Sequence, residues 1–228
     1  MNNLEIKKFA QMIADDSKVL MINLLMDGGF HTVNELAKSA QIKPHTASYH
    51  LKRMLDENFL TMEKHGRFHY FKLTNQDFAQ FFESIGAITP TKPARYLSQH
   101  LEMEKMIMAR TCYDHLAGKL GVCITQYLLE KNYLNYSGEE VHVTTEGSYF
   151  FEKQGIDLLM LKKQKRQFCR MCLDWSERRH HIAGSLGHAI YDLFITKKWI
   201  IKSPKSRAVI LTQQGLFEIN NGWGLDLE

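Results

Sequence analysis

Two short segments of the chain bring cysteine and histidine together. Cys112 lies three residues before His115, and Cys172 lies nine residues before His181. Both histidines begin the pattern His-x-Ala-Gly-x-Leu-Gly, and the two copies are 66 residues apart. Two thiols and two imidazoles form an adequate ligand set for zinc or a related soft metal. The pattern therefore predicts a metal site made of Cys112, His115, Cys172 and His181.

Other interpretations of this cluster remain open. Seven Lys or Arg residues between positions 162 and 179 would lower the pKa of the thiol of Cys169 or Cys172 and make it redox-sensitive. An organic effector would instead occupy a pocket, and the candidate effector-binding residues are Cys112, Tyr113, His115, Cys172, Trp175 and His181. The same residues also suit a purely structural role, because cysteine is often buried as a small hydrophobe. Helical structure over residues 110–120 would place Cys112 and His115 on one face, one turn apart, and we expect the same of Cys169 and Cys172.

A second group of side chains suits contact with DNA. Residues 44–57 show helical apolar spacing, and the other face of that helix carries hydroxyls and cations that reach base edges and phosphates. Residues 59–63 and 68–73 predict two strands, with a basic turn at His65 and Gly66 suited to phosphate or minor-groove contacts. The candidate DNA-binding residues are His45, Thr46, Ser48, Tyr49, Lys52, Arg53, Lys64, His65 and Arg67. This order, a recognition helix followed by a wing, indicates double-stranded DNA as the partner.

The distribution of charge agrees with this interpretation. The whole chain of 228 residues has a net charge of +4, and residues 1–88 contain ten basic and ten acidic side chains. Residues 43–72 contain six basic side chains against three acidic ones, together with four histidines. The positive charge is therefore concentrated on the predicted DNA face.

Other signals frame these two groups. Helices are predicted over residues 4–14 and 17–26, the second capped by Asp16 or Ser17. Thr32 caps a short third helix, with Glu35 completing a capping box. A further helix begins at Asn75 or Asp77. We therefore predict a DNA-binding domain at residues 1–88, a linker at 89–96 marked by two prolines, and a sensor and dimerisation domain at 97–228.

The predicted sensor domain contains an internal repeat, with units at about 110–160 and 176–228. The fold class is mainly α with small β-hairpins (α+β): an N-terminal winged helix-turn-helix followed by two pseudo-repeated winged-helix-like units. We expect Gly118, Gly121, Gly184 and Gly187 to let two helices approach closely. The basic residues of 162–170 are expected on a solvated helix surface.

Residues 10–85 resemble the ArsR/SmtB-like winged-helix repressors, whose recognition helix often reads Ser/Thr-x-x-Ser-x-His-Leu-x-x-Leu. Ser48, His50 and Leu51 hold matching places here, and Thr46 lies one residue after the place of the first Ser/Thr. The resemblance implies a homodimer that binds an inverted-repeat operator and represses transcription until an inducer binds, with residues 1–14 and 75–88 as candidate dimer helices. Two metal sites known in such repressors are missing, since residues 33–40 have no cysteine and residues 77–85 have no histidine.

The composition excludes several other classes of protein. The N-terminus lacks the apolar core of a signal peptide, and no apolar run approaches the roughly 20 residues of a membrane span. We expect a cytoplasmic, reduced protein with no membrane partner and no enzymatic activity. A cysteine-dependent hydrolase using Asp114, His115, Asp174 and His181 is the alternative from another class. The predicted function is a repressor whose operator affinity is controlled by an unidentified effector. The alternative is a metal- or thiol-responsive repressor. The cofactor, if there is one, is unknown, and zinc is one candidate.

Overall fold

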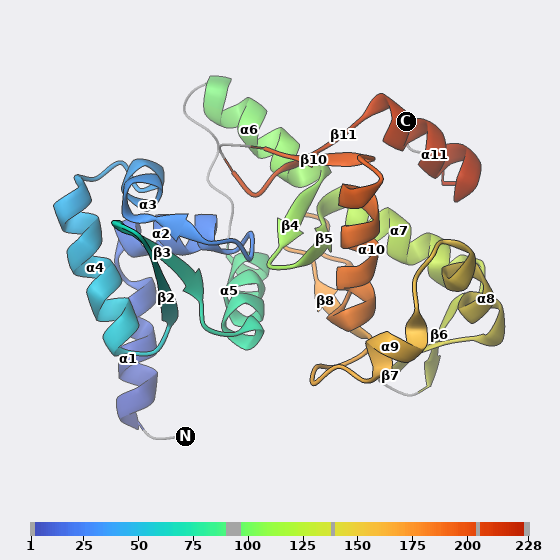
Figure 1. Cartoon of the computed structure of the whole chain (residues 1–228), viewed down its shortest axis with the longest axis horizontal. Coiled ribbons are helices and arrows are strands. Elements are labelled where there is room, and N and C mark those ends of the chain that lie inside the picture. The colour runs from blue at the N-terminus through green and yellow to red at the C-terminus, as the bar shows by residue number, and fades with distance from the viewer. Residues whose placement is uncertain (1–2, 90–96, 138–139, 204–205, 226–228) are drawn as a thin grey trace. The chain divides into compact units, whose positions relative to one another are not determined.

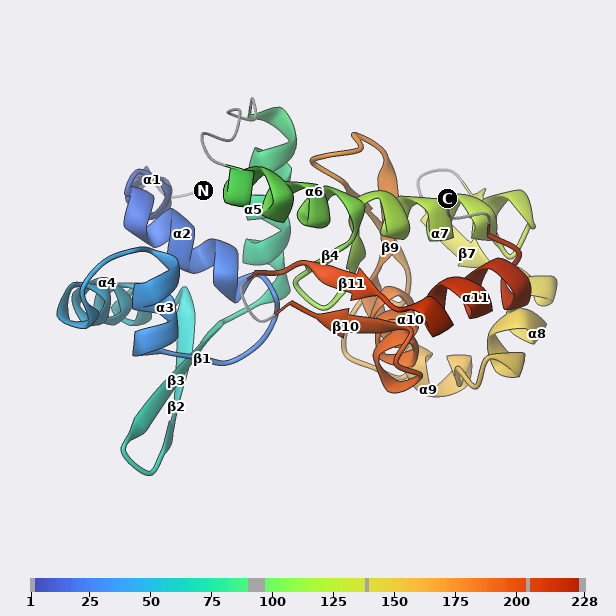
Figure 2. The ribbon, with the colours of Figure 1, turned by 90° about the horizontal axis from the view of Figure 1, so that it is seen from above.

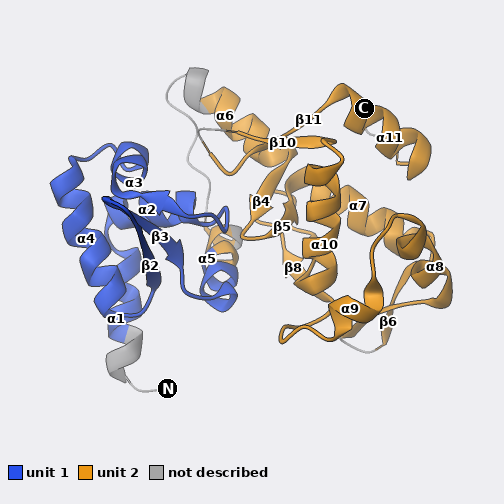
Figure 3. Cartoon of the chain, in the orientation of Figure 1, with its two compact units in different colours: residues 1–82 blue, residues 83–228 orange. Residues whose placement is uncertain are grey.

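The chain divides into two compact units, residues 1–82 and residues 83–228 (Figure 3). The computed structural model describes residues 3–89, 97–137, 140–203 and 206–225. The predicted linker, apart from Thr89, lies outside these residues. Each unit has its own core and is described separately.

Unit 1 is a small helical domain with one three-stranded antiparallel sheet (Figure 1). Its elements are α1 (Asn3–Ile13), α2 (Asp16–Leu25), β1 (His31–Thr32), α3 (Val33–Ser39), α4 (Pro44–Asp56), β2 (Leu60–His65), β3 (Phe68–Leu73) and the first half of α5 (Gln76–Ile88). The strand order is β1-β3-β2. The β2–β3 register runs from Leu60 opposite Leu73 to His65 opposite Phe68.

Local signals set the helix boundaries of unit 1. The capping box at α3 is confirmed: the Thr32 side chain accepts a hydrogen bond from the Glu35 backbone, and the Glu35 side chain accepts one from the Thr32 backbone. Pro44 begins α4, where its missing N–H costs no hydrogen bond. Two expectations need correction. Asp15, rather than Asp16 or Ser17, caps α2, and the hairpin turns at Gly66 and Arg67, one residue later than expected.

The apolar faces of these helices meet the inner face of the sheet. The fully buried side chains include Met21, Ile22, Leu25, Leu36, Ala47, Leu51, Met54 and Leu73. Phe9 of α1 packs edge-on against Phe59, Phe78 and Phe81, with ring centroids 4.6–5.4 Å apart. The buried side of α4 thus fixes which of its side chains face outward.

Unit 2 contains the second half of α5 and a longer series of elements. They are α6 (Leu97–Met108), β4 (Arg110–Cys112), β5 (His115–Ala117), α7 (Gly118–Glu130), β6 (Leu134–Ser137), β7 (Glu140–Val143), α8 (Thr145–Lys153), α9 (Leu158–Lys162), β8 (Arg170–Leu173), β9 (His180–Ala183), α10 (Gly184–Thr196), β10 (Ile200–Lys202), β11 (Val209–Leu211) and α11 (Gln213–Gly222). Among the described residues its strands pair as four antiparallel hairpins, and an isolated bridge joins Arg110 of β4 to Ala208. The order hairpin, helix, hairpin, helix therefore occurs from Arg110 to Lys153 and again from Arg170 to Gly222.

The prediction of a helix over residues 110–120 is wrong. Residues 110–117 form the β4–β5 hairpin, and Tyr113 in its two-residue turn has a left-handed φ of 61°. Cys169 precedes strand β8, so Cys169 and Cys172 do not share a helix face either. The helix expected over residues 162–170 ends at Lys162. Strands of three or four residues are too short for apolar periodicity to distinguish them from helix.

Gly121 and Gly187 allow a close contact that differs from the helix–helix contact we expected. A Cβ on Gly121 would lie 2.5 Å from the backbone oxygen of Leu116, and one on Gly187 would lie 2.6 Å from that of Ile182. Each glycine therefore lets a helix approach the hairpin that precedes it, rather than a second helix. Gly118 and Gly184 begin α7 and α10 with left-handed φ angles of 76° and 81°.

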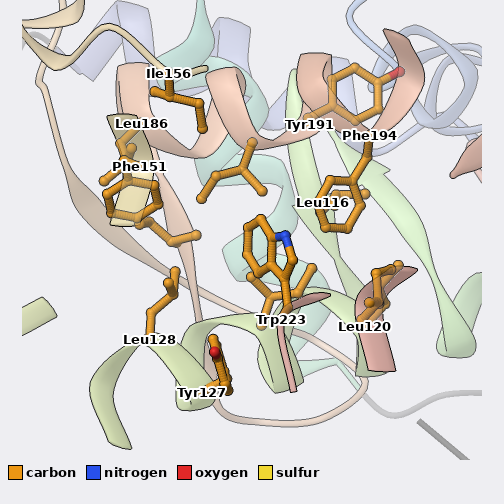
Figure 4. Packing of buried hydrophobic residues seen from close by; sticks show 14 of the residues in the cluster. Leu116, Leu120, Tyr127, Leu128, Phe151, Ile156, Leu186, Tyr191, Phe194 and Trp223 are labelled. Carbon is orange, nitrogen blue, oxygen red and sulfur yellow. The ribbon is translucent and has the colours of Figure 1, made fainter. Parts of the chain in front are cut away.

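One apolar core joins the two halves of unit 2. Helix α7 packs on strand β9, and helix α10 packs on strand β5. Figure 4 shows aromatic and aliphatic side chains of the core around Trp223; those labelled with it are Leu116, Leu120, Tyr127, Leu128, Phe151, Ile156, Leu186, Tyr191 and Phe194. Thr125 of α7 accepts a 2.8 Å hydrogen bond from the Ile182 backbone of β9. Neither half buries its apolar face alone.

Among the residues that the structure describes, no helix has the length and apolar character needed to cross a membrane.

Candidate DNA interface and buried cysteine–histidine site

Helix α4 presents polar side chains on its outer face. His45, Ser48, Tyr49, Lys52 and Arg53 are exposed, and Thr46 is half-buried. The Ser48 hydroxyl donates a 2.9 Å hydrogen bond to the Pro44 carbonyl and keeps its lone pairs free to accept. The structure therefore gathers the predicted helix residues on one accessible face.

The β2–β3 hairpin extends away from the helices of unit 1 (Figure 2). Residues 61–69 are exposed, including Lys64, His65 and Arg67. The Arg67 guanidinium lies 5.2 Å from the centre of the Phe68 ring, which restrains it at the tip. A projecting basic hairpin next to an exposed polar helix has the form of a recognition helix and wing.

Four buried side chains converge in unit 2. Cys112 and His115 face each other across the β4–β5 hairpin, and Cys172 and His181 face each other across the β8–β9 hairpin. The two Sγ atoms are 3.9 Å apart, and the two Nε2 atoms are 3.1 Å apart. The four potential ligand atoms all lie within 4.8 Å of one another. The predicted four residues are therefore together, although hairpin pairing rather than a helix face brings them there.

Each histidine has a carboxylate behind it. His115 Nδ1 lies 3.4 Å from Asp114 Oδ1, and His181 Nδ1 lies 3.4 Å from Asp174 Oδ2. Asp114 is held by Arg166. Asp174 accepts a 2.7 Å hydrogen bond from the Gly118 backbone and pairs at 2.9 Å with Arg110. The two carboxylates orient both rings so that the Nε2 atoms meet.

The electrostatics of the cluster follow from burial and these neighbours. Burial alone would lower the pKa of His181, but Asp174 and Cys112 raise it to about 9. Burial would raise the pKa of Asp174, but His181 and Arg110 hold it well below its usual range. The contact with Cys172, together with burial, raises the pKa of the Cys112 thiol. Both carboxylates thus stay ionised next to the imidazoles.

A buried ionic network lies next to the cluster. Arg110 pairs at 3.1 Å with Glu83 as well as with Asp174, and Arg207 pairs at 3.1 Å with the other Glu83 oxygen. The side chains of Glu83, Arg110 and Asp174 are at most 1% exposed. Burial would raise the pKa of Glu83, but Arg207 and Arg110 lower it below its usual value. Sequence reasoning missed this network, because nothing in the local pattern around Glu83 or Arg207 marks them as buried.

The other predicted effector residues have separate positions. Tyr113 lies half-buried in the turn of the β4–β5 hairpin. Trp175 stacks on Arg110, whose guanidinium carbon is 4.4 Å from the ring centre. Cys169 packs in the apolar core, and burial raises the pKa of its thiol to about 12, opposite to the lowering we expected.

Comparison with known proteins agrees with the form of unit 1. The family model described as "Bacterial regulatory protein, arsR family" matches residues 15–61. The chain is 41% identical over 213 residues to a Bacillus subtilis (strain 168) protein named "Uncharacterized HTH-type transcriptional regulator YdfF", and the match covers 93% of this chain and 94% of that protein.

Similar solved structures include NolR from Sinorhizobium fredii, 15% identical with a TM-score of 0.36, which matches 39% of this chain and 88% of its own. Another is the homodimeric winged helix-turn-helix DNA-binding domain of Mb0332 from Mycobacterium bovis, 14% identical with a TM-score of 0.34, which matches 40% of this chain and 88% of its own. The extent of the match to the Bacillus relative and the family match across α2 to β2 lead to one conclusion: the chain belongs to the arsR family of bacterial regulatory proteins and is a DNA-binding transcriptional regulator.

Proposed function

We propose that the protein is a homodimeric repressor that reads an inverted-repeat operator through α4 and the β2–β3 wing, under the control of an effector bound in unit 2. The observation that carries the DNA-reading part is the exposed face of α4. It carries hydroxyl, imidazole and cationic side chains and no carboxylate between His45 and Arg53. Such side chains bind base edges in the major groove, while the basic wing contacts the backbone.

The proposed homodimer follows from having one reading helix in each chain. An inverted repeat presents two half-sites one helical turn apart, so two chains are needed to fill them. Helices α7 and α10 do not substitute for α4, because most of their residues are buried. Helix α5 offers an apolar surface for pairing, since Phe81 is 45% exposed.

We also infer that unit 2 consists of two winged-helix-like repeats. Helices α4, α7 and α10 end in the same way: Asn58, Asn132 and Lys198 take left-handed φ angles of 55–60°. In each case the next residue donates a backbone hydrogen bond five residues back, from Phe59 to Met54, Tyr133 to Leu128 and Trp199 to Phe194. A hairpin and a helix follow each time, and Thr144 and Thr212 cap their helices through Gly147 and Gly215. Repeats that share a helix stop, a hairpin and a cap support a common origin.

The effector proposal rests on where polar groups are buried. Unit 2 contains the cysteine–histidine cluster, and the ionic network beside it ends at Glu83 on α5, a helix whose first half belongs to unit 1. A ligand that binds one arrangement of this cluster better than another would shift the population of operator-binding dimers.

Fluorescence anisotropy with duplex DNA from upstream of the protein's own gene tests the DNA-reading assignment. We expect Lys52→Ala and Arg67→Ala each to weaken binding and to reduce the slope of log K against log salt by about 1, because each cation neutralises a phosphate or contacts a base. The matched control is Lys119→Ala, which removes an exposed cation from α7. If the double variant Lys52→Ala/Arg67→Ala bound as tightly as Lys119→Ala, the assignment of α4 and the wing would be wrong. Sedimentation of the complex gives the number of chains per operator, and one chain would exclude the homodimer.

A further inference from the structure

We infer that Cys112, His115, Cys172 and His181 form a closed tetrahedral site for a soft divalent cation, with Zn²⁺ as the first choice. The site is made by two hairpins that lie 60 to 66 residues apart in the chain. It does not depend on DNA binding, so its test and the test of the proposed function can fail independently.

The distances fit a tetrahedral ion. With Zn–S bonds of about 2.3 Å and Zn–N bonds of about 2.05 Å, tetrahedral angles place the two sulfurs about 3.8 Å apart and the two nitrogens about 3.3 Å apart. The observed separations are 3.9 Å for sulfur and 3.1 Å for nitrogen. The sulfur–nitrogen pairs, at most 4.8 Å apart, would close to about 3.6 Å through side-chain rotations.

The two carboxylates favour the ring tautomer that binds a metal. Asp114 and Asp174 each lie 3.4 Å from an Nδ1 atom, so a neutral ring with its proton on Nδ1 would present its Nε2 lone pair to the centre of the cluster. In the metal-free chain the 3.1 Å gap between the two Nε2 atoms accommodates one shared proton, and in the metal-bound chain both Nε2 lone pairs would bind the ion instead. The arrangement of carboxylate, histidine and metal is the one that orients zinc ligands and increases their basicity.

Burial and charge select the kind of ligand. All four side chains are at most 2% exposed, so the cluster suits a single ion better than an organic molecule. Binding displaces to solvent the two thiol protons and the proton that lies between the two Nε2 atoms, and Zn²⁺ with two thiolates and two neutral imidazoles has no net charge. A neutral complex avoids the penalty of burying an isolated charge. With all four positions filled by protein there is no place for a catalytic water, which distinguishes this site from a hydrolytic zinc centre.

The origin of the ligands gives the ion a defined role. Each hairpin supplies one sulfur and one nitrogen, and the Cβ positions of the histidines lie against the helix of the other half, at Gly121 for His181 and Gly187 for His115. A bound ion therefore fastens the two halves of unit 2 to each other. Removing it would loosen the contact between the two hairpins before either hairpin unfolds.

Titration of the chelator-treated, reduced full-length protein with Co²⁺ tests the site directly. We expect one Co²⁺ per chain, with the thiolate-to-cobalt charge-transfer absorption and the intense visible bands typical of tetrahedral coordination, and displacement by one equivalent of Zn²⁺. Cys112→Ser and His181→Asn should each reduce the charge-transfer absorption or weaken Co²⁺ binding at least tenfold. The matched control is Cys169→Ser, which removes a buried thiol outside the cluster and should leave the spectrum unchanged.

Because Cys112 is buried, its variant is compared with wild type by circular dichroism, and His115→Asn provides an independent test of the same centre. Absence of Co²⁺ uptake by the folded, fully reduced wild type would overturn the inference. An octahedral cobalt spectrum would also overturn it. A tetrahedral spectrum that persists in both Cys112→Ser and His115→Asn but is lost in Cys169→Ser would overturn it as well.

Discussion

The substitution Glu83→Gln tests the buried ionic network of unit 2. Glu83 accepts from Arg110 through one oxygen and from Arg207 through the other, both at 3.1 Å, and its side chain is 1% exposed. Glutamine keeps the shape, but its NH₂ group would face one of the two guanidinium groups. Breaking a buried ion pair by changing one partner costs about 3–5 kcal/mol, since the other charges stay buried.

The expected shift in the melting temperature follows from the size of unit 2. At an unfolding entropy of about 2.1 cal/mol/K per residue, a unit spanning residues 83–228 has an entropy of about 0.3 kcal/mol/K. A loss of 3–5 kcal/mol then lowers the Tm by about 10–16 °C. Differential scanning calorimetry measures this, with the exposed Glu152→Gln on α8 as the control, for which we expect a change within about 0.5 kcal/mol. If the Tm of Glu83→Gln lay within about 2 °C of that of the control, the stabilising role given to this network would be refuted.

The same carboxylate gives a dependence on pH with a defined sign. Arg207 and Arg110 lower the pKa of Glu83 in the folded chain relative to the unfolded chain, against the effect of burial. The stability that it contributes is therefore present above the unfolded pKa of about 4.3 and is lost as the pH falls through the lower folded pKa. The difference in Tm between wild type and Glu83→Gln should shrink below about pH 4.3. A difference that stayed constant down to about pH 2 would contradict the assigned cause.

Three further predictions concern other parts of the molecule. Gly121→Ala should destabilise unit 2 by about 1–3 kcal/mol, because the added Cβ would lie 2.5 Å from a backbone oxygen. The control is Gly86→Ala on helix α5, where the nearest atom would be 3.5 Å from the added Cβ, and this change should be neutral or stabilising. Thermal melts compare the two variants. A strong chelator should lower the Tm of wild type but not that of Cys112→Ser, and equal shifts would contradict the metal site. Ser48→Ala should change relative affinity among operator sequences by about 1–3 kcal/mol if its hydroxyl contacts a base, as competition binding with mutated operators would show.

Unit 1 was predictable from sequence because its signals are local. Thr32 and Glu35 are three residues apart and cap each other, and Pro44 can begin a helix but rarely continue one. The apolar spacing of α4 also extends over three turns, long enough to fix which face is buried. The predicted boundaries that shifted, at Asp15 and at the hairpin tip, moved by one or two residues, where several neighbouring residues can serve as a cap or turn.

The cysteine–histidine cluster was predicted in its residues but not in its geometry. The repeated pattern pointed to Cys112, His115, Cys172 and His181. However, two residues three positions apart, such as Cys112 and His115, can lie either on one face of a helix or on the two sides of a two-residue hairpin turn. The left-handed Tyr113 in that turn gives no sequence signal, because glycine or asparagine would be expected there. Partners such as Glu83 and Arg207, 124 residues apart, meet only through tertiary packing.

The division of the cluster between two hairpins has a consequence for how its affinity depends on concentration. One hairpin supplies two of the four ligands. If the two hairpins were on separate chains, those chains would have to associate to complete the site, and the apparent affinity for metal would fall on dilution. In this chain the second half is covalently attached, which replaces the bulk concentration with a fixed effective one. The occupancy of the site would then report the free metal concentration alone, whatever the amount of protein present.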